Sequence, residues 1–224
     1  VNRVANGLLD LGIKKGDRVA ALMYNCHQFM EIYFALAKIG AIMVPLNFRL
    51  VAREVQFALD NSGSNTLFMG PEFLETVATV RSSLKTVRSF FSIGPKAPAN
   101  VTDYETFFSN YSDQEPAVEV SEEDEQLIIY TSGTTGRPKG AVYTHSTTIW
   151  MSLSQIVDFG FNKNDITAIS GPLYHVGGLI DLTMPMFHTG GSCIMMRSTG
   201  FNPKETLELI EREKITLILL FPIM

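Results

Sequence analysis

The sequence contains little cysteine: Cys26 and Cys193 are its only two, and they lie far apart. They therefore offer no pair with the spacing of metal ligands. We expect two reduced, buried thiols, since free cysteine behaves as a small apolar residue.

Long apolar runs are also missing. No stretch reaches the roughly 18 uncharged apolar residues that a membrane-spanning helix needs. The nearest candidate, residues 176–196, contains Asp181, His188 and several glycines. The first residues, VNRVANGLLDLG, lack the basic region and apolar stretch of a secretory signal. We therefore expect a cytoplasmic protein without a transmembrane segment.

An excess of basic residues is absent as well. The formal net charge is −5, with 18 Lys and Arg against 23 Asp and Glu. Seven of the acidic residues lie between Asp113 and Glu125, and the rest of the chain is nearly neutral. This distribution gives no sign of a nucleic-acid partner, and we interpret the acidic run as a solvated linker.

The sequence does contain ample apolar material, 46% of 224 residues, in alternating strand-like and helix-like segments. A helical pattern at residues 27–39, for example, lies between apolar runs at 18–23 and 41–44. Such alternation predicts an α/β fold with mostly parallel β-sheets flanked by helices. The other expected strands are 66–69, 89–93, 127–130, 141–145, 166–170, 192–196 and 216–221, and the other expected helices are 1–11, 52–61, 72–84, 104–111, 146–157, 179–187 and 203–214.

The most informative segment is YTSGTTGRPKG, from Tyr130 to Gly140. Its glycines let backbone N–H groups approach a ligand, its hydroxyls can donate to phosphate oxygens, and Lys139 adds a positive charge. A Walker A loop would continue from the lysine into a helix, whereas here Pro138 precedes the lysine and a strand-like segment follows Gly140. The pattern predicts a phosphate-binding loop that joins strand to strand.

A second segment, PLYHVGG at residues 172–178, places an aromatic residue and a histidine downstream of this loop. Together, TSGTTGRPKG and PLYHVGG resemble the adenylate-forming (AMP-binding) enzymes, a superfamily of acyl-CoA synthetases, adenylation domains of peptide synthetases, and luciferases. The segment PLNFRL at residues 45–50 is most similar to fatty-acid and aryl-acid CoA ligases. The resemblance covers the whole chain.

The resemblance implies roles for particular residues. Tyr174 and His175 would line the pocket of the carboxylic acid, and His175 and Lys139 would be catalytic. The Thr131 hydroxyl is a candidate Mg²⁺ ligand. ATP, Mg²⁺ and coenzyme A would be the cofactors and co-substrates. The ATP phosphates would be held by Thr131, Ser132, Gly133, Thr134, Thr135, Gly136 and Lys139.

The resemblance also implies an organisation in two sheet lobes. Residues 16–165 would form the first lobe, which carries the phosphate loop, and residues 1–15 with 166–224 would belong to a second, incomplete one. Because family members are considerably longer, we expect part of a large N-terminal domain that lacks the small C-terminal domain and is inactive alone. The parent protein would convert a carboxylic acid into an acyl-adenylate and transfer it to coenzyme A.

Two other interpretations stay open from the sequence. The parent could be an adenylation domain that loads a carrier protein, or the chain could be a nucleotide-binding module without catalysis. Thioester formation on coenzyme A or on a carrier separates the first alternative from a CoA ligase.

Overall fold

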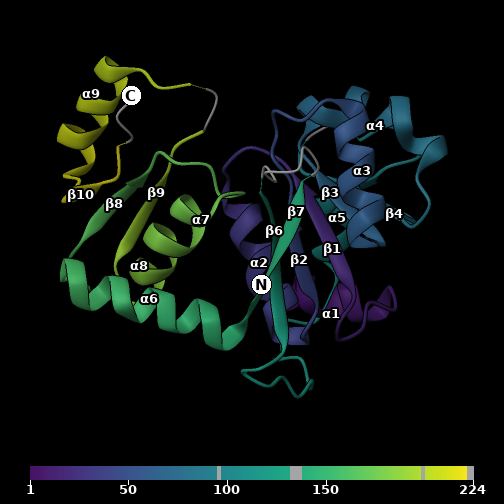
Figure 1. Ribbon diagram of the computed structural model, residues 1–224, viewed down its shortest axis with the longest axis horizontal. Coiled ribbons are helices and arrows are strands. Elements are labelled where there is room, and N and C mark those ends of the chain that lie inside the picture. Colours follow the sequence, from purple (N-terminus) through teal and green to yellow (C-terminus); the bar gives the residue numbers. More distant parts are fainter. Residues whose placement is uncertain (95–96, 132–137, 198–199, 221–224) are drawn as a thin grey trace. The chain divides into compact units, whose positions relative to one another are not determined.

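The computed structural model describes residues 1–94, 97–131, 138–197 and 200–220 (Figure 1). Contacts between Cα atoms divide the chain into two units. The first comprises residues 1–23 and 28–145, and the second comprises residues 24–27 and 146–224.

This division differs from the expected lobes in three places. Residues 1–15 fall in the first unit, and residues 24–27 and 146–165 fall in the second. Residues 1–15 join the first unit because the helix α1 (Asn2–Asp10) packs on the helix α5 (Tyr104–Phe108). The Asn6 side chain there donates to two backbone carbonyls, at 2.8 Å to Ser112 and 2.9 Å to Gln114. How the lobes are divided in a longer protein stays a prediction.

The first unit contains a seven-stranded sheet in the order β5-β4-β3-β1-β2-β6-β7. Every neighbouring pair is parallel except β6 and β7, which form an antiparallel hairpin at one edge. The strands are β1 (Arg18–Leu22), β2 (Ile42–Pro45), β3 (Thr66–Met69), β4 (Ser89–Ser92), β5 (Thr102–Asp103), β6 (Glu125–Thr131) and β7 (Lys139–Thr144).

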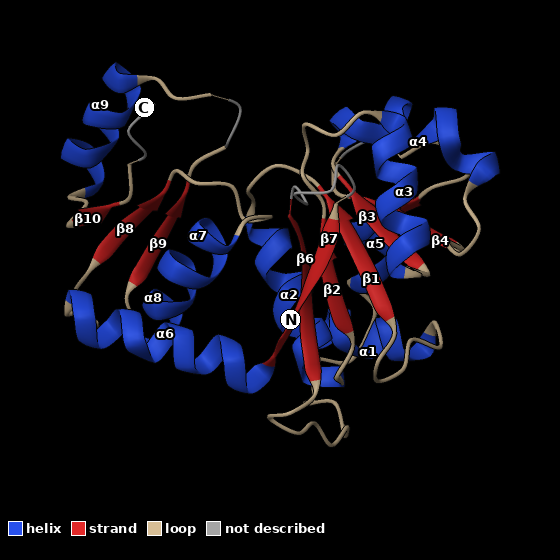
Figure 2. Ribbon diagram, viewed as in Figure 1, coloured by secondary structure: helices blue, strands red, loops and turns tan. Residues whose placement is uncertain are grey.

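Helices cover both faces of this sheet. The chain steps in one direction from β1 to β2 and in the other from β2 to β3, so right-handed crossovers put α2 (His27–Ile39) and α3 (Ala52–Ser62) on opposite faces. Figure 2 shows α3 in front of the strands. Between β3 and β4, α4 (Leu74–Val80) lies between the 3₁₀ turns η1 (Pro71–Phe73) and η2 (Arg81–Ser83).

The central strands are buried along almost their whole length, which explains why they read as continuous apolar runs. Phe68 of β3 is fully buried and anchors an aromatic cluster. Its ring centroid lies 5.0 Å from Phe91, 5.9 Å from Tyr104 and 6.0 Å from Phe108. This cluster ties the sheet to α5.

The helix α3 matters for the site because it lies beside the β6–β7 hairpin. It begins after Val51, which has no capping side chain, and the Glu54 carboxylate compensates by accepting the Val51 N–H at 3.0 Å. It ends at Gly63 in the left-handed conformation, with φ of 67°. Glycine adopts this conformation at low cost, so the end of the helix is well defined.

The acidic run of residues 113–125 is exposed, as expected for a linker, but it is also tied to the first unit by ion pairs. The Lys15 ammonium lies 2.6 Å from Asp124, and Lys38 pairs with Glu115. Hydrogen bonds from these lysines lower the pKa of both carboxyl groups. The linker is therefore held in place ahead of β6.

The second unit contains a three-stranded parallel sheet in the order β10-β8-β9. Its strands are β8 (Ile166–Ile169), β9 (Ser192–Met195) and β10 (Leu217–Ile218), and its helices are α6 (His145–Phe159, which begins at the last residue of the first unit), α7 (Val176–Gly178), α8 (Met184–Thr189) and α9 (Pro203–Glu213). A π turn, η3 (Leu179–Thr183), joins α7 to α8.

Both cysteines are free and half-buried rather than fully buried, so their expected burial was only partly right. Burial raises the pKa of the Cys193 thiol to about 11. This thiol is therefore protonated at neutral pH and a poor nucleophile.

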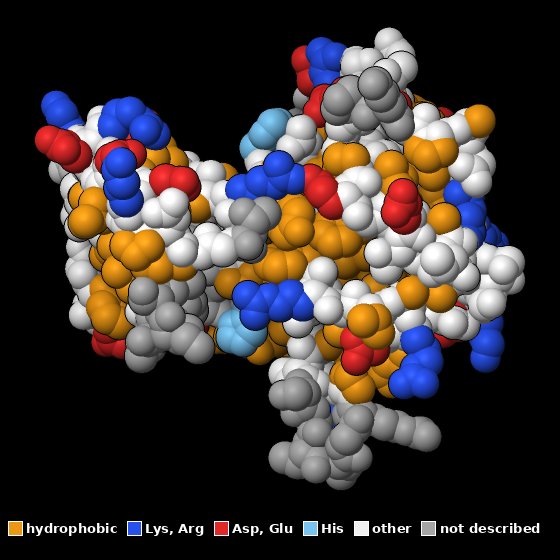
Figure 3. Space-filling view, turned by 90° about the horizontal axis from the view of Figure 1, so that it is seen from above, with side chains coloured by type: hydrophobic (Ala, Val, Ile, Leu, Met, Phe, Trp, Pro, Cys, Tyr) orange, Lys and Arg blue, Asp and Glu red, His pale blue; other side chains and the backbone are white. Residues whose placement is uncertain are grey.

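Several large hydrophobic side chains reach the surface. Trp150, Val157 and Phe159 of α6 are 68%, 81% and 67% exposed. Figure 3 shows one face of the molecule, on which hydrophobic, basic and acidic side chains are interspersed. Among the described residues, none of the helices combines the length and the apolar character needed to cross a bilayer.

Candidate functional site

The β6–β7 hairpin presents the two described ends of the predicted phosphate loop. Thr131 is the last residue of β6 and Lys139 is the first of β7, and the two are directly paired in the antiparallel register. Side chains of directly opposed residues lie on the same face of a sheet. Both residues are exposed. Ser132, Gly133, Thr134, Thr135 and Gly136 lie outside the described residues.

The position of the hairpin in the sheet suits ligand binding. Because β6 runs parallel to β2, Thr131 lies at the carboxyl-end edge of the parallel strands. Ligands of open α/β sheets bind outside this edge. Thr131 and Lys139 are therefore placed together where an anionic ligand would be expected, and the Thr131 hydroxyl lies 3.4 Å from the carbonyl oxygen of Lys139.

Tyr130 anchors the hairpin to α3. Its hydroxyl donates to Asn61 Oδ1 at 2.7 Å and lies 3.4 Å from the carbonyl oxygen of Ala58. Burial raises the pKa of Tyr130. Sequence reasoning missed this anchor, since nothing in the local pattern links Tyr130 to a side chain 69 residues away.

Gly140, opposite Tyr130, has a packing reason to be glycine. A Cβ atom at this position would lie 2.7 Å from Cγ2 of Ile128, closer than side chains tolerate. The glycine after Lys139 thus allows β7 to pass close to β6.

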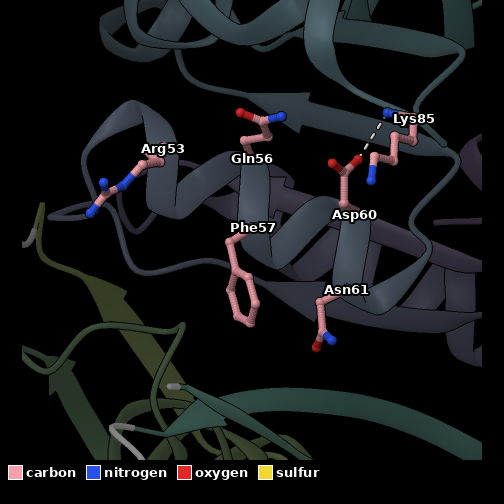
Figure 4. Close-up of a pocket in the computed structure, with 6 residues that line it drawn as sticks. All are labelled: Arg53, Gln56, Phe57, Asp60, Asn61 and Lys85. Atoms are coloured by element: carbon pink, nitrogen blue, oxygen red, sulfur yellow. Dashed lines mark hydrogen bonds between the residues drawn. The ribbon is translucent and has the colours of Figure 1, made fainter. Parts of the chain in front are cut away.

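An open hollow of about 450 Å³ lies along α3. Figure 4 shows its lining, Arg53, Gln56, Phe57, Asp60, Asn61 and Lys85, with the Lys85 backbone N–H donating to Asp60 at 2.9 Å. Its charges are of both signs, and it lacks the paired hydroxyl and ammonium of the hairpin. We therefore place the candidate site at the hairpin rather than in this hollow.

Tyr174 and His175 lie in the turn between β8 and α7 of the second unit. His175 is the N-cap of α7, and its Nδ1 accepts the Gly177 backbone N–H at 3.2 Å. With Nδ1 acting as an acceptor, the neutral ring carries its proton on Nε2. The exposed imidazole can therefore donate a hydrogen bond to an anionic ligand such as a carboxylate.

A carboxyl group that sequence reasoning did not single out, Asp181, stands near this histidine. It belongs to the π turn η3, and Gln155 of α6 donates to its Oδ1 at 3.5 Å. Burial raises the pKa of Asp181. π turns are frequent at functional sites, and this one carries Asp181.

His188, for which the sequence offered no partner, pairs with Ser152. The Ser152 hydroxyl lies 2.7 Å from Nδ1 of His188. Burial lowers the pKa of His188. Because Ser152 itself is fully buried, we assign this pair to the packing of α6 on α8.

The structure therefore brings together Thr131 with Lys139 in the first unit, and Tyr174 with His175 in the second. Within the described ranges, no three His, Cys, Asp or Glu side chains gather as ligands of a metal ion. Thr131 offers one oxygen donor of the kind that Mg²⁺ prefers in proteins.

Comparisons with known proteins show what the chain is similar to. Residues 1–224 match the AMP-binding enzyme family. The feruloyl-CoA synthase of an Amycolatopsis species is 35% identical over 224 residues, which are 100% of this chain and 42% of that protein. The chain thus spans less than half the length of this curated relative.

Two solved structures extend the comparison. The anthranilate CoA ligase AuaEII in complex with anthranoyl-AMP is 25% identical, with a TM-score of 0.92 over 97% of this chain and 42% of its own. ATP-bound MatB from Rhodopseudomonas palustris is 25% identical, with a TM-score of 0.83 over 97% of this chain and 41% of its own. From the match over its full length, the chain belongs to the AMP-binding enzyme family.

Proposed function

We propose that this chain is part of an ATP-dependent acid–CoA ligase. The longer protein activates a carboxylic acid as an acyl-adenylate with release of pyrophosphate, and then transfers the acyl group to coenzyme A. The observation that carries the proposal is the direct pairing of Thr131 with Lys139 at the two ends of the segment SGTTGRP, at the carboxyl-end edge of the sheet.

The similar proteins support this chemistry. One is a feruloyl-CoA synthase, one was solved with anthranoyl-AMP, which is an acyl-adenylate, and one was solved with ATP. The similar proteins therefore include one named for making a CoA thioester, one in complex with ATP and one in complex with an acyl-adenylate. These support CoA ligation over the loading of a carrier protein.

Lys139 would act on the nucleotide. A carboxylate is a weak electrophile, and adenylation gives its carbon a good leaving group. During that step negative charge grows on the phosphates, and a preorganised ammonium stabilises it. The hydroxyls and amides of residues 131–136 would hold the same phosphates. Mg²⁺ would neutralise part of their charge, with the Thr131 hydroxyl as its protein ligand.

His175 would act on the acid. Its Nδ1 is engaged with the backbone, so Nε2–H is the group left to hold a carboxylate oxygen. A neutral donor orients the carboxylate without withdrawing the electron density that it needs for attack on the α-phosphate. Tyr174, adjacent in the same turn, would form part of the acid pocket.

The test is acid-dependent ATP–pyrophosphate exchange in a full-length protein that carries these residues. Lys139→Ala should weaken transition-state stabilisation by about 1 to 3 kcal/mol, which is the scale of a lost charged hydrogen bond. This loss corresponds to a fall in kcat/KM of roughly 5- to 150-fold. Lys14→Ala, which removes another exposed lysine of the same unit, should leave the rate unchanged. Undiminished exchange in the Lys139 variant would contradict the assignment.

His175→Ala should cost more in exchange than Lys139→Ala, whereas a defect confined to ATP binding would show that its role is misplaced. Formation of a thioester on coenzyme A, and none on a carrier protein, is expected. We also expect residues 1–224 alone to bind nucleotide without turnover.

A further inference from the structure

Asn25 makes an unusual set of contacts for a residue outside the regular elements. It lies between β1 and α2, in the short segment Tyr24–His27 that belongs to the second unit. It is only 7% exposed. A buried amide needs partners for both its donor and its acceptor, so its surroundings reveal what it holds.

Among the described residues, its partners are backbone groups at the end of β8 and in the turn that follows it. The Asn25 amide nitrogen donates to the carbonyl oxygen of Gly171 at 2.8 Å and lies 3.5 Å from that of Ile169. Its Oδ1 accepts the backbone N–H of Leu173 at 2.9 Å. One side chain thus fixes the backbone on both sides of Pro172.

The segment that carries Asn25 is held at a second point. The guanidinium carbon of Arg197, which follows β9, lies 5.1 Å from the centre of the Tyr24 ring. A cation–π contact of this kind attracts the Tyr24 ring to Arg197. The segment of Asn25 is therefore attached to the residues after β9 as well as to the turn after β8.

The turn that Asn25 holds leads directly into Tyr174 and His175. The His175 backbone N–H donates to the Pro172 carbonyl oxygen at 3.1 Å. A Cβ on Gly178 would lie 2.4 Å from the same oxygen. The turn is closely packed, so a shift of Leu173 would be passed on to the side chains that follow it.

We propose that Asn25 is a positioning residue, which fixes the turn at residues 171–173 so that Tyr174 and His175 face the carboxylic acid correctly. This inference rests on the proposed function. Asparagine is required because the turn offers a carbonyl oxygen and an N–H at the spacing of one amide group. Aspartate has no donor for Gly171, and aliphatic side chains have neither group.

The kinetic test compares Asn25→Ala and Asn25→Asp with wild type in the full-length protein, by acid-dependent ATP–pyrophosphate exchange. We expect kcat/KM for the acid to fall about tenfold or more, because two backbone groups lose their partner, while KM for ATP stays within about twofold. If the alanine variant does not fold, Asn25→Ser is measured in its place, because its short hydroxyl cannot reach both backbone groups and the same fall in kcat/KM is expected.

The matched control is Ser64→Ala in the first unit. Ser64 is fully buried and its hydroxyl lies 2.7 Å from that of the half-buried Ser62, so the variant loses one part-buried hydrogen bond away from this turn. It should reduce stability without changing kcat/KM for the acid. An unchanged kcat/KM for the acid in the Asn25 variants that fold, or the same fall in the control, would overturn the inference.

Hydrogen exchange gives a readout that does not depend on activity. In the full-length Asn25 variants, amides of residues 173–178 should exchange about tenfold faster or more, while those of β1 to β3 keep their protection. Unchanged exchange at residues 173–178 would overturn the role of Asn25 by itself. If wild type shows no acid-dependent activity, the proposed function fails, and hydrogen exchange still decides whether Asn25 holds the turn.

Discussion

Tyr130→Phe removes a single hydroxyl from the hairpin that carries the phosphate loop. In the structure this hydroxyl joins β6 to α3 through Asn61, at 2.7 Å. Asn61 is exposed, so water can replace the lost partner, and the loss should correspond to an ordinary hydrogen bond rather than to a buried unsatisfied group. We expect the free energy of unfolding to fall by about 0.5 to 1.5 kcal/mol.

The assay is urea denaturation followed by circular dichroism, with the slope against urea unchanged. The matched control is Tyr143→Phe in the same hairpin. Among the described residues, the Tyr143 hydroxyl makes no hydrogen bond, so this variant should change stability by less than about 0.5 kcal/mol.

A double-mutant cycle identifies the partner. If Tyr130 acts through Asn61, then Asn61→Ala should cost little more once Tyr130 is already phenylalanine, with a coupling energy of about 0.5 kcal/mol or more. Strict additivity of the two substitutions would refute the anchor. An equal loss in the Tyr143 variant would refute it as well.

Three further outcomes are expected. Phe68→Ala should destabilise the first unit by about 3 to 5 kcal/mol in the same urea assay, because the ring is fully buried in the aromatic cluster, and a loss below about 1 kcal/mol would contradict that packing. Burial lowers the folded-state pKa of His188. The contribution of this histidine to the free energy of unfolding should therefore be complete above about pH 6.5 and be lost as the pH falls through the lower folded-state pKa. Thermal melts of His188→Gln should lack this pH dependence. The double variant Trp150→Glu, Val157→Glu should reduce the binding of an apolar dye to residues 1–224. Leu207→Glu in α9 replaces a side chain as exposed as Trp150 and should reduce dye binding less.

The sequence predicted the fold class because most of its signals are local. The strands of the first unit are buried on both faces, so they appear as apolar runs, and α2 was predicted at its observed bounds. The two-residue strand β5 was missed because so short a segment has no periodicity.

Two helices predicted as continuous are interrupted. The segment expected at residues 179–187 is divided between the π turn η3 and α8. Pro185 has no N–H to donate to the carbonyl oxygen four residues earlier. The Thr183 hydroxyl donates to the Gly178 carbonyl oxygen at 2.6 Å and so competes with the backbone for that acceptor. The segment expected at 72–84 is likewise divided into η1, α4 and η2.

For the candidate site, the sequence pointed to residues in two motifs, whose roles stay predictions, and the structure places Thr131 opposite Lys139. Asn25, Asn61 and Asp181 were not predicted. Each acts through a contact with a residue distant in the sequence or with backbone atoms, and no local pattern specifies such a contact. Their roles became visible only from distances and burial.

The central claim is that residues 131–139 hold the phosphates of a nucleotide. It is tested most directly by a crystal structure of the full-length protein with Mg²⁺ and a non-hydrolysable ATP analogue. We predict phosphate oxygens within hydrogen-bond distance of the Thr131 hydroxyl and the Lys139 ammonium. A nucleotide bound with its phosphates elsewhere, for example in the hollow along α3, would contradict the account.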